Sequence, residues 1–284
     1  MKVLVLFALV AAVAAEEDPL AWYRDYHNNI GIPMAKKIKA LEEAQDFDGS
    51  SAASRIYGGS VSPLGANPHL GGLVILLNNG DTSVCGSSLV NNRCVVTAAH
   101  CWYTQNSQAR QFTVVLGSTT LFYGGTRVTT TSVTTHSNYD PYWLINDIAV
   151  ARINTVGTNN NINPINLPTG NLANQNFNGY WATAAGYGKI AQTIGNNQVQ
   201  RQTDIQVVAN SVCSNIYGSN TVISSTVCCA TNNGRSTCSG DSGGPLAIWN
   251  GNSRVLVSLP VYIFILKYLE SLKLVRNWQS LSNL

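Results

Sequence analysis

Residues 56–256 contain no glutamate and only one lysine, Lys189. Seven arginines and this lysine stand against five aspartates there, so this part of the chain carries a net charge of +3. The basic residues are spread out rather than clustered, which argues against nucleic acid as a partner. Arginine keeps its charge at high pH, where lysine loses it. We therefore hypothesise an alkaline working environment such as a gut lumen, with compositional drift as the alternative.

Patterns that bind metal ions are also missing. No two histidines have the spacing His-x-x-x-His, and no carboxylate occurs between Thr82 and Tyr139. Calcium needs several hard oxygen ligands close together. We therefore expect neither a metal ion nor another cofactor.

Apolar runs are too short for a membrane span. Val3–Val13 follows Lys2 and ends in small residues, which is typical of a secretory signal peptide over residues 1–15. A later run, Val255–Leu266, is also short and is interrupted by Pro260. We expect a secreted, extracellular protein with no membrane partner, in an oxidising compartment where cysteines can pair.

The most informative stretch that is present is Thr237–Leu246, with the sequence TCSGDSGGPL. It sets Ser242 in a glycine-rich turn directly after Asp241. A serine hydroxyl is a poor nucleophile unless a base takes its proton and donors hold the oxyanion that forms. Gly240 has no side chain, so its N–H can lie close to a reacting carbonyl, beside the N–H of Ser242. Glycines around a serine also occur in ordinary tight turns, so the motif needs partners elsewhere.

Two upstream segments supply candidates for those partners. Val95–Cys101 has the pattern of a buried strand that runs into a bend carrying His100, and Asp147 comes just ahead of an apolar strand start. The order His, Asp, Ser is one of the known orders of the acyl-transfer triad. The three other histidines lie in no such motif and are interpreted as ordinary surface residues: His27, His69 and His136.

Residues 56 to about 256 resemble secreted serine endopeptidases of the chymotrypsin family, and look closest to insect digestive chymotrypsins. The matching segments are Ile56–Gly59 (IYGG), Thr97–Cys101 (TAAHC), Asp147–Ala149 (DIA) and Gly240–Pro245 (GDSGGP). The resemblance implies that Ser242 is the nucleophile, that His100 is the general base and then the general acid, and that Asp147 orients the imidazole. It also implies an oxyanion hole formed by the N–H groups of Gly240 and Ser242. The expected partners are protein or peptide substrates, and we expect a monomer.

The resemblance implies an all-β fold of two antiparallel six-stranded β-barrels, with the active site in the cleft between them. The first barrel would cover about residues 56–165 and the second about residues 166–256. Short apolar, β-branched runs between turns fit this class: Leu73–Leu77, Phe112–Leu116, Arg127–Thr135, Ile148–Ile153 and Asp204–Val208.

Residues 16–55 are interpreted as an activation propeptide. They are polar, with eight acidic and five basic side chains, and we expect a short helix around Met34–Ala44. The polar loop that follows is a typical cutting site, so we expect an activating trypsin-like protease to cut between Arg55 and Ile56. By resemblance, the freed amine of Ile56 would then pair with Asp241 and order the substrate site.

Substrate preference depends on one position. In the family the floor of the specificity pocket lies six residues before the nucleophile, which is Ser236 here. A lysine or arginine side chain buried there would have no carboxylate partner, which is costly. We therefore expect a chymotrypsin-like preference for large apolar and aromatic residues.

The chain has seven cysteines. The resemblance implies two disulfides, Cys85–Cys101 and Cys213–Cys228. Cys94 is expected to be a buried thiol, and Cys229 could compete with its neighbour for Cys213. Cys238 lacks its usual partner, since no cysteine follows it.

The resemblance stops at about residue 256. Residues 257–284 contain neither glycine nor cysteine and are interpreted as an atypical tail, so the second barrel is expected to be incomplete. Two functions follow. One is a digestive serine endopeptidase made as a zymogen, which the triad residues favour. The alternative, which the tail favours, is a catalytically silent secreted homologue or a truncated isoform.

Overall fold

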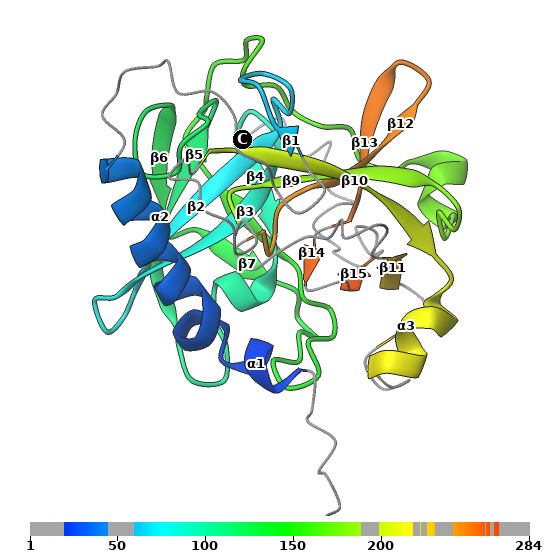
Figure 1. Cartoon of the computed structure of the whole chain (residues 1–284), viewed down its shortest axis with the longest axis horizontal. Coiled ribbons are helices and arrows are strands. Elements are labelled where there is room, and N and C mark those ends of the chain that lie inside the picture. The colour runs from blue at the N-terminus through cyan, green and yellow to red at the C-terminus, as the bar shows by residue number, and fades with distance from the viewer. Residues whose placement is uncertain are drawn as a thin grey trace, which may run out of the picture.

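The computed structural model describes residues 20–44, 60–188, 199–217, 222, 226–230, 241–258, 260–261 and 264–266. The described part of the chain is mostly β, with two antiparallel sheets and a few helices (Figure 1). This is the all-β class that the sequence predicts. Among the described helices, none is both long and apolar enough to cross a membrane.

The first sheet has seven strands in the order β6-β5-β2-β3-β4-β8-β7. Every pairing in it is antiparallel, and consecutive strands are mostly neighbours, as expected for barrels built from hairpins. Its strands are β2 (Leu70–Leu77), β3 (Thr82–Asn91), β4 (Cys94–Thr97), β5 (Ala109–Leu116), β6 (Thr126–Thr130), β7 (Val133–Thr135) and β8 (Ala149–Arg152).

The segment 127–135, expected as one strand, is divided into two. β6 pairs with β5, whereas β7 pairs with β8 at the other end of the sheet. The chain turns at Thr131 and Ser132, where the N–H of Ser132 donates to the hydroxyl of Thr130. One run of β-branched residues thus provides the strands at both ends of the sheet, β6 and β7.

The second sheet follows the order β13-β12-β9-β10-β11-β15-β14, with β1 beside β10. It includes two short strands from the tail, since β15 pairs with β11 and β14 pairs with β15. Part of residues 257–284 therefore extends the sheet that was expected to be incomplete. The strands are β1 (Ser60–Val61), β9 (Trp181–Gly186), β10 (Arg201–Val208), β11 (Thr226–Ala230), β12 (Leu246–Asn250), β13 (Ser253–Ser258), β14 (Pro260–Val261) and β15 (Phe264–Leu266).

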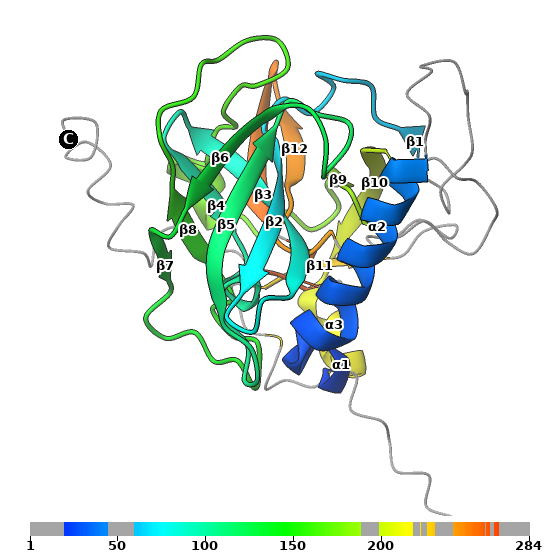
Figure 2. The ribbon, with the colours of Figure 1, turned by 90° about the vertical axis from the view of Figure 1, so that its left-hand side faces the viewer.

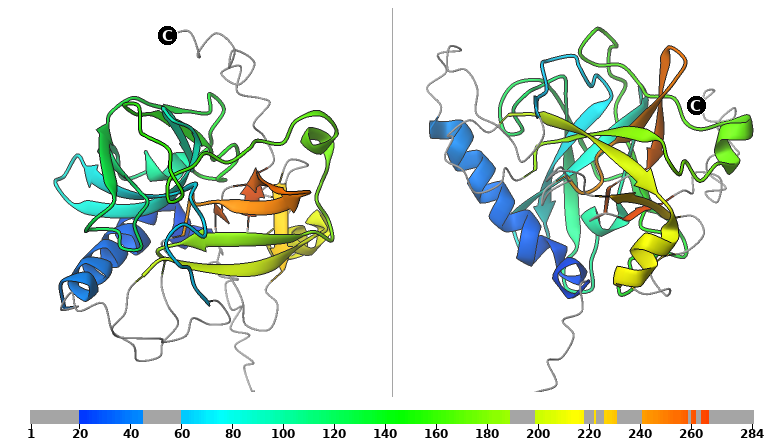
Figure 3. Two further views of the ribbon diagram at one scale, coloured as in Figure 1. Left: turned by 90° about the horizontal axis from the view of Figure 1, so that it is seen from above. Right: turned by 45° about the vertical axis from the view of Figure 1, so that its right-hand side comes forward.

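Three α-helices accompany the sheets in the described part of the chain. α3 (Asn210–Tyr217) follows β10, and its Cys213 is joined to Cys228 of β11. The other two, α1 (Ala21–Arg24) and α2 (Ile32–Ala44), come from the N-terminal segment and are linked by a π-helical turn, His27–Gly31. Figure 2 shows this blue segment along the outside of β2 and β3. Both views in Figure 3 show it beside the cyan strands of the first sheet, and α2 contacts β3.

The helix expected around Met34–Ala44 is confirmed and begins at Ile32. Two other expectations from the sequence need correction. Three histidines interpreted as surface residues are all buried, with exposed fractions of 0%, 3% and 7%: His27, His69 and His136. Burial lowers the pKa of His27 and of His69 to about 3, so both are neutral. Cys229 is a buried free thiol, whereas Cys94 is only partly buried.

Candidate active site

His100 lies in a 3₁₀ turn, Ala99–Cys101, directly after β4. Its side chain is 1% exposed. The neighbouring Cys101 is disulfide-bonded to Cys85 of β3, which is one of the pairs that the resemblance implied. Thr97, at the end of β4, donates its hydroxyl to the carbonyl of Gly86, 2.7 Å away. The turn is therefore fixed to β3 on both sides of His100.

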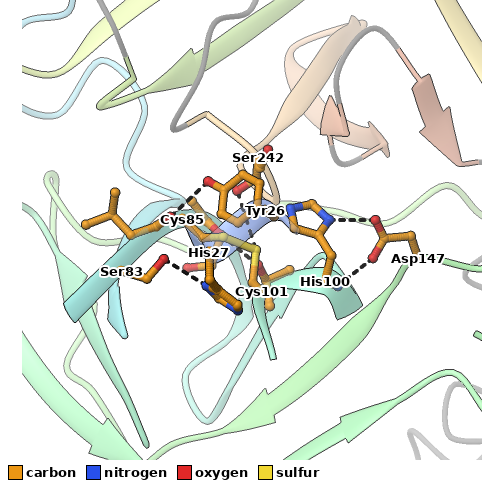
Figure 4. The surroundings of a disulfide bond; sticks show 12 residues. Tyr26, His27, Ser83, Cys85, His100, Cys101, Asp147 and Ser242 are labelled. Carbon is orange, nitrogen blue, oxygen red and sulfur yellow. Dashed lines mark hydrogen bonds and ion pairs between the residues drawn. A yellow bond between two sulfur atoms is a disulfide. The ribbon is translucent and has the colours of Figure 1, made fainter. Parts of the chain in front are cut away.

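Asp147 faces His100 from the loop before β8 (Figure 4). Its Oδ2 lies 2.6 Å from Nδ1 of the imidazole, and its Oδ1 accepts the backbone N–H of His100 at 2.8 Å. The preceding Asn146 has a φ of 55°, a left-handed conformation that asparagine tolerates. Its side-chain amide donates to the carbonyl of Asn138 at 2.8 Å, which holds the loop in place. The carboxylate is fully buried, so this pair is shielded from water.

Ser242 comes from the loop before β12 and is 5% exposed. Its carbonyl accepts the N–H of Gly86 at 2.7 Å, which attaches the serine loop of the second sheet to β3 of the first. A Cβ on Gly86 would lie 2.6 Å from the Cα of Gly244, so only glycine permits this approach. Gly243 has a φ of 79°, a conformation that glycine adopts without strain. Local sterics therefore explain why glycine is needed at position 243 of the GDSGG motif and at position 86 of β3, which faces it.

The carboxylate of Asp241 lies at the end of β9. Its Oδ1 accepts the N–H of Gly188 at 2.8 Å. A Cβ on Gly186 would lie 2.1 Å from the same oxygen, so the carboxylate needs glycine there. Its expected partner, the amine of Ile56, lies outside the described residues, as do Arg55, Gly240, Ser236 and Cys238.

The residue that sequence reasoning missed is Tyr26. Its ring packs against the imidazole of His100, with centroids 4.5 Å apart and planes tilted by 54°. Figure 4 shows Tyr26 and Ser242 on the side of the imidazole that faces away from Asp147. Burial raises the pKa of Tyr26 above its ordinary range, a hydrogen bond with the side chain of Ser242 opposes this rise, and the charge of Asp241 adds to it. Tyr26 therefore contacts both candidate catalytic side chains.

One signal in the sequence could have pointed to this contact. The segment was interpreted as polar, yet Ile30, Met34 and Ile38 recur at the four-residue spacing of one helix face. All three are buried in the structure. An apolar stripe on a helix needs a surface to cover it, and here that surface is β3.

The arrangement has the parts needed for acyl transfer. An imidazole is oriented by a buried carboxylate, and its Nε2 has no hydrogen-bond partner among the described residues. A neutral imidazole held in this way can take a proton from a nearby hydroxyl. Cys85, His100 and Cys101 bring their ligand atoms within 4.8 Å of one another, but the two sulfurs are joined in a disulfide and are not available to a metal ion.

Comparison with known proteins agrees with this geometry. The model of the family described as Trypsin matches residues 56–258. The chain belongs to the trypsin family of serine proteases. Curated relatives include a collagenase of Hypoderma lineatum, 34% identical over 70% of this chain and 74% of its own, and trypsin beta of Drosophila erecta, 34% identical over 68% of this chain and 73% of its own.

The chain is also similar to solved structures. The structure of a protein described as HL collagenase superposes on it with a TM-score of 0.66 and 32% sequence identity, and the match covers 72% of this chain and 85% of the other. The two antiparallel sheets are those of the trypsin-like two-barrel fold. The matched part ends at residue 258 and begins at residue 56, so residues 20–44, which carry Tyr26, lie before it.

Proposed function

We propose that this chain is a secreted serine endopeptidase made as a zymogen, which hydrolyses peptide bonds through an acyl-enzyme. The supporting observation is the two-point contact between Asp147 and His100, with Ser242 beside the imidazole. Family membership supports proteolysis in general. The roles of the individual residues are part of the proposal.

In the proposed mechanism Ser242 Oγ attacks the substrate carbonyl carbon while His100 Nε2 takes the hydroxyl proton. The N–H groups of Gly240 and Ser242 hold the negative oxygen of the tetrahedral intermediate. His100 then gives the proton to the leaving amine, and the C–N bond breaks. Water repeats the sequence on the acyl-enzyme and releases the acid. Asp147 stabilises the imidazolium throughout and remains ionised.

For substrate preference we propose large apolar and aromatic residues, because Ser236 leaves the pocket floor without a charge. The relatives carry the names collagenase and trypsin, so the proposal rests on this position rather than on them. The test compares amide substrates that end in phenylalanine, leucine, lysine or arginine. Ser236→Asp is expected to move the preference toward lysine and arginine, and Ser236→Thr serves as the control. A wild-type preference for basic residues would contradict the assignment.

Secretion and a digestive role are also proposed. The apolar N-terminal run supports export, and the two disulfides in the structure suit an oxidising compartment. Activation would follow a cut between Arg55 and Ile56 by a trypsin-like protease.

The direct test uses a fluorophosphonate probe on the chain after this cut and after removal of the N-terminal fragment. We expect a single label on Ser242. Ser242→Ala and His100→Ala should each abolish labelling, whereas the exposed Ser253→Ala should keep it. No label on a folded, cut wild-type chain would favour the silent homologue instead.

A further inference from the structure

Residues 20–44 cover the candidate active site. In their presence His100 is 1% exposed, Ser242 is 5% exposed and Tyr26 is fully buried. A substrate carbonyl must come within about 3–3.5 Å of the serine oxygen to react. With Tyr26 packed on the imidazole and lying beside Ser242, that approach is closed. The site cannot work until these residues leave it.

The part of the segment nearest the site is fixed by polar contacts. The hydroxyl of Tyr26 donates to the carbonyl of Val84 in β3 at 2.9 Å. Nδ1 of His27 lies 2.8 Å from the hydroxyl of Ser83, the preceding residue of β3. A Cβ on Gly31 would lie 1.9 Å from Ser83 Oγ, so the turn between α1 and α2 needs glycine to come this close. These contacts fix the position of Tyr26 against the candidate active site.

A second anchor lies at the far end of α2. Glu42 is 2% exposed, and its carboxylate accepts the N–H groups of Leu121 and Phe122 at 2.6 and 2.7 Å. Burial raises the pKa of Glu42, while the two backbone N–H bonds and the nearby guanidinium of Arg127 oppose this rise. Because these bonds lie far along the helix from Tyr26, they hold the segment without touching the candidate site.

A third contact is made by Arg24, at the end of α1. Its guanidinium carbon lies 3.7 Å from the centre of the Tyr142 ring, and its Nε donates to the carbonyl of Tyr142 at 2.8 Å. Tyr142 belongs to the loop that leads to Asp147. The segment thus contacts the loops of both His100 and Asp147.

A single cut after residue 44 would leave the segment with no covalent link to the rest of the chain. The first cysteine of the chain is Cys85, so no disulfide can join residues 20–44 to the sheets. We propose that residues 20–44 are a built-in inhibitor, an amphipathic helical peptide that binds noncovalently over Ser242 and His100 with Tyr26 in the place of substrate. This rests on the proposed function in that the covered site is the proteolytic one. Cutting at Arg55–Ile56 would then be followed by a separate release step.

The first measurement does not require catalysis. In the full chain, residues 51–55 are replaced by the recognition site of a sequence-specific protease that leaves Ile56 as the new N-terminus. After the cut, gel filtration should show the N-terminal fragment eluting with the rest of the chain. Hydrogen–deuterium exchange at C2 of the His100 imidazole, followed by mass spectrometry, should remain slow until the fragment is separated and should then rise at least tenfold.

Variants test each contact with a matched control. Tyr26→Ala should raise His100 exchange at least tenfold in the uncut chain, whereas Trp22→Ala, at a 59% exposed position, should not. Glu42→Ala should release the fragment from the cut chain faster, whereas Lys37→Ala, at an exposed position of the same helix, should leave release unchanged. A synthetic peptide of residues 20–44 should slow His100 exchange when added back, and the same peptide with Tyr26→Ala should not.

The outcomes separate this proposal from the proposed function. Immediate loss of the fragment on cutting, or equal His100 exchange in the wild type and Tyr26→Ala, would overturn the inhibitor. The fluorophosphonate probe decides proteolysis: it should label the cut, fragment-free chain at least tenfold faster than the cut chain that retains the fragment. Failure to label either form would reject the enzyme, while co-elution and slow His100 exchange would still establish the covering segment.

Discussion

Asp147 contacts His100 at two atoms, since one carboxylate oxygen faces the imidazole Nδ1 at 2.6 Å and the other accepts the backbone N–H at 2.8 Å. The contact with Nδ1 bears on catalysis and the contact with the backbone N–H bears on stability, so a substitution that removes only the first can distinguish the two. In Asp147→Asn the amide oxygen can still accept the backbone N–H, but the amide nitrogen would face Nδ1 and force the wrong tautomer.

We therefore expect Asp147→Asn to lower kcat by about 10⁴-fold. Its Tm should stay closer to that of the wild type than the Tm of Asp147→Ala, which leaves buried polar groups without partners. Turnover of an aromatic ester by the fragment-free enzyme, together with thermal unfolding, provides the check. A kcat within tenfold of the wild type would remove Asp147 from the mechanism.

The second prediction concerns activation. Asp241 bonds to the N–H of Gly188 in the uncut chain, and the amine that would pair with it is absent until Ile56 becomes a terminus. Arg55→Gln should give a protein that trypsin does not activate, whereas Arg55→Lys should be activated normally. Turnover is measured before trypsin treatment, and again after treatment and removal of the N-terminal fragment. Equal activity of the wild type before and after treatment would refute this scheme.

The third prediction uses the pH dependence of the N-terminal segment. His27 packs against Tyr26, lies 2.8 Å from the hydroxyl of Ser83 and faces the charge of His100. Burial and then the charge of His100 lower its pKa from 6.5 to about 3. A lowered histidine pKa favours the bound segment above pH 6.5, and this contribution is lost as the pH falls toward 3. Between pH 7.5 and 5.0 binding should weaken about 30-fold, or ~2 kcal/mol.

Glu42 acts in the opposite direction, because burial raises its pKa and protonation therefore favours the bound segment. His27→Asn separates the two effects, since asparagine can still bond to Ser83 but does not titrate. The dissociation rate of the fragment from the cut chain is measured at both pH values. The acid acceleration should be clearly smaller in His27→Asn than in the wild type. An identical pH dependence in both proteins would rule out His27 as its source.

The grouping of His100, Asp147 and Ser242 was predicted from the resemblance of their short motifs to a known family, and the residues around those motifs have local steric reasons. Gly243 needs its positive φ, and Gly86 permits the close approach of the serine loop. Strand positions were predictable because alternation of apolar residues is a local property.

The place of Tyr26 was not predictable in this way. Its partners, Val84 and Ser242, are distant in the sequence, and an apolar helix face indicates only that something covers it. The burial of His27 results from the same packing. Because His27 lies in no motif, the sequence offered no sign of this packing, and the residue was interpreted as exposed. The strands of the tail were missed because β15 is only three residues long and is recognised by its pairing with β11.

The last prediction concerns this pairing and a thiol that reports on it. Ile265 lies inside the second sheet, opposite Val227 of β11 on one side and Pro260 on the other. Ile265→Pro removes its N–H from the ladder and should destabilise the sheet by roughly 1–3 kcal/mol. Ile265→Thr keeps the N–H and the β-branched shape, so its effect on the ladder should be smaller. Cys229, in β11, is a buried free thiol whose pKa is raised to about 12 by burial.

A buried thiol with a raised pKa reacts slowly, because the thiolate is the reactive form. Alkylation of Cys229 by iodoacetamide, resolved from Cys94 by peptide mass spectrometry, should therefore be slow in the wild type and in Ile265→Thr. It should become faster in Ile265→Pro, with a lower Tm, if the tail strands support β11. Unchanged alkylation and Tm in the proline variant would mean that β15 contributes nothing to the sheet. The second barrel would then depend on the strands before residue 259 alone.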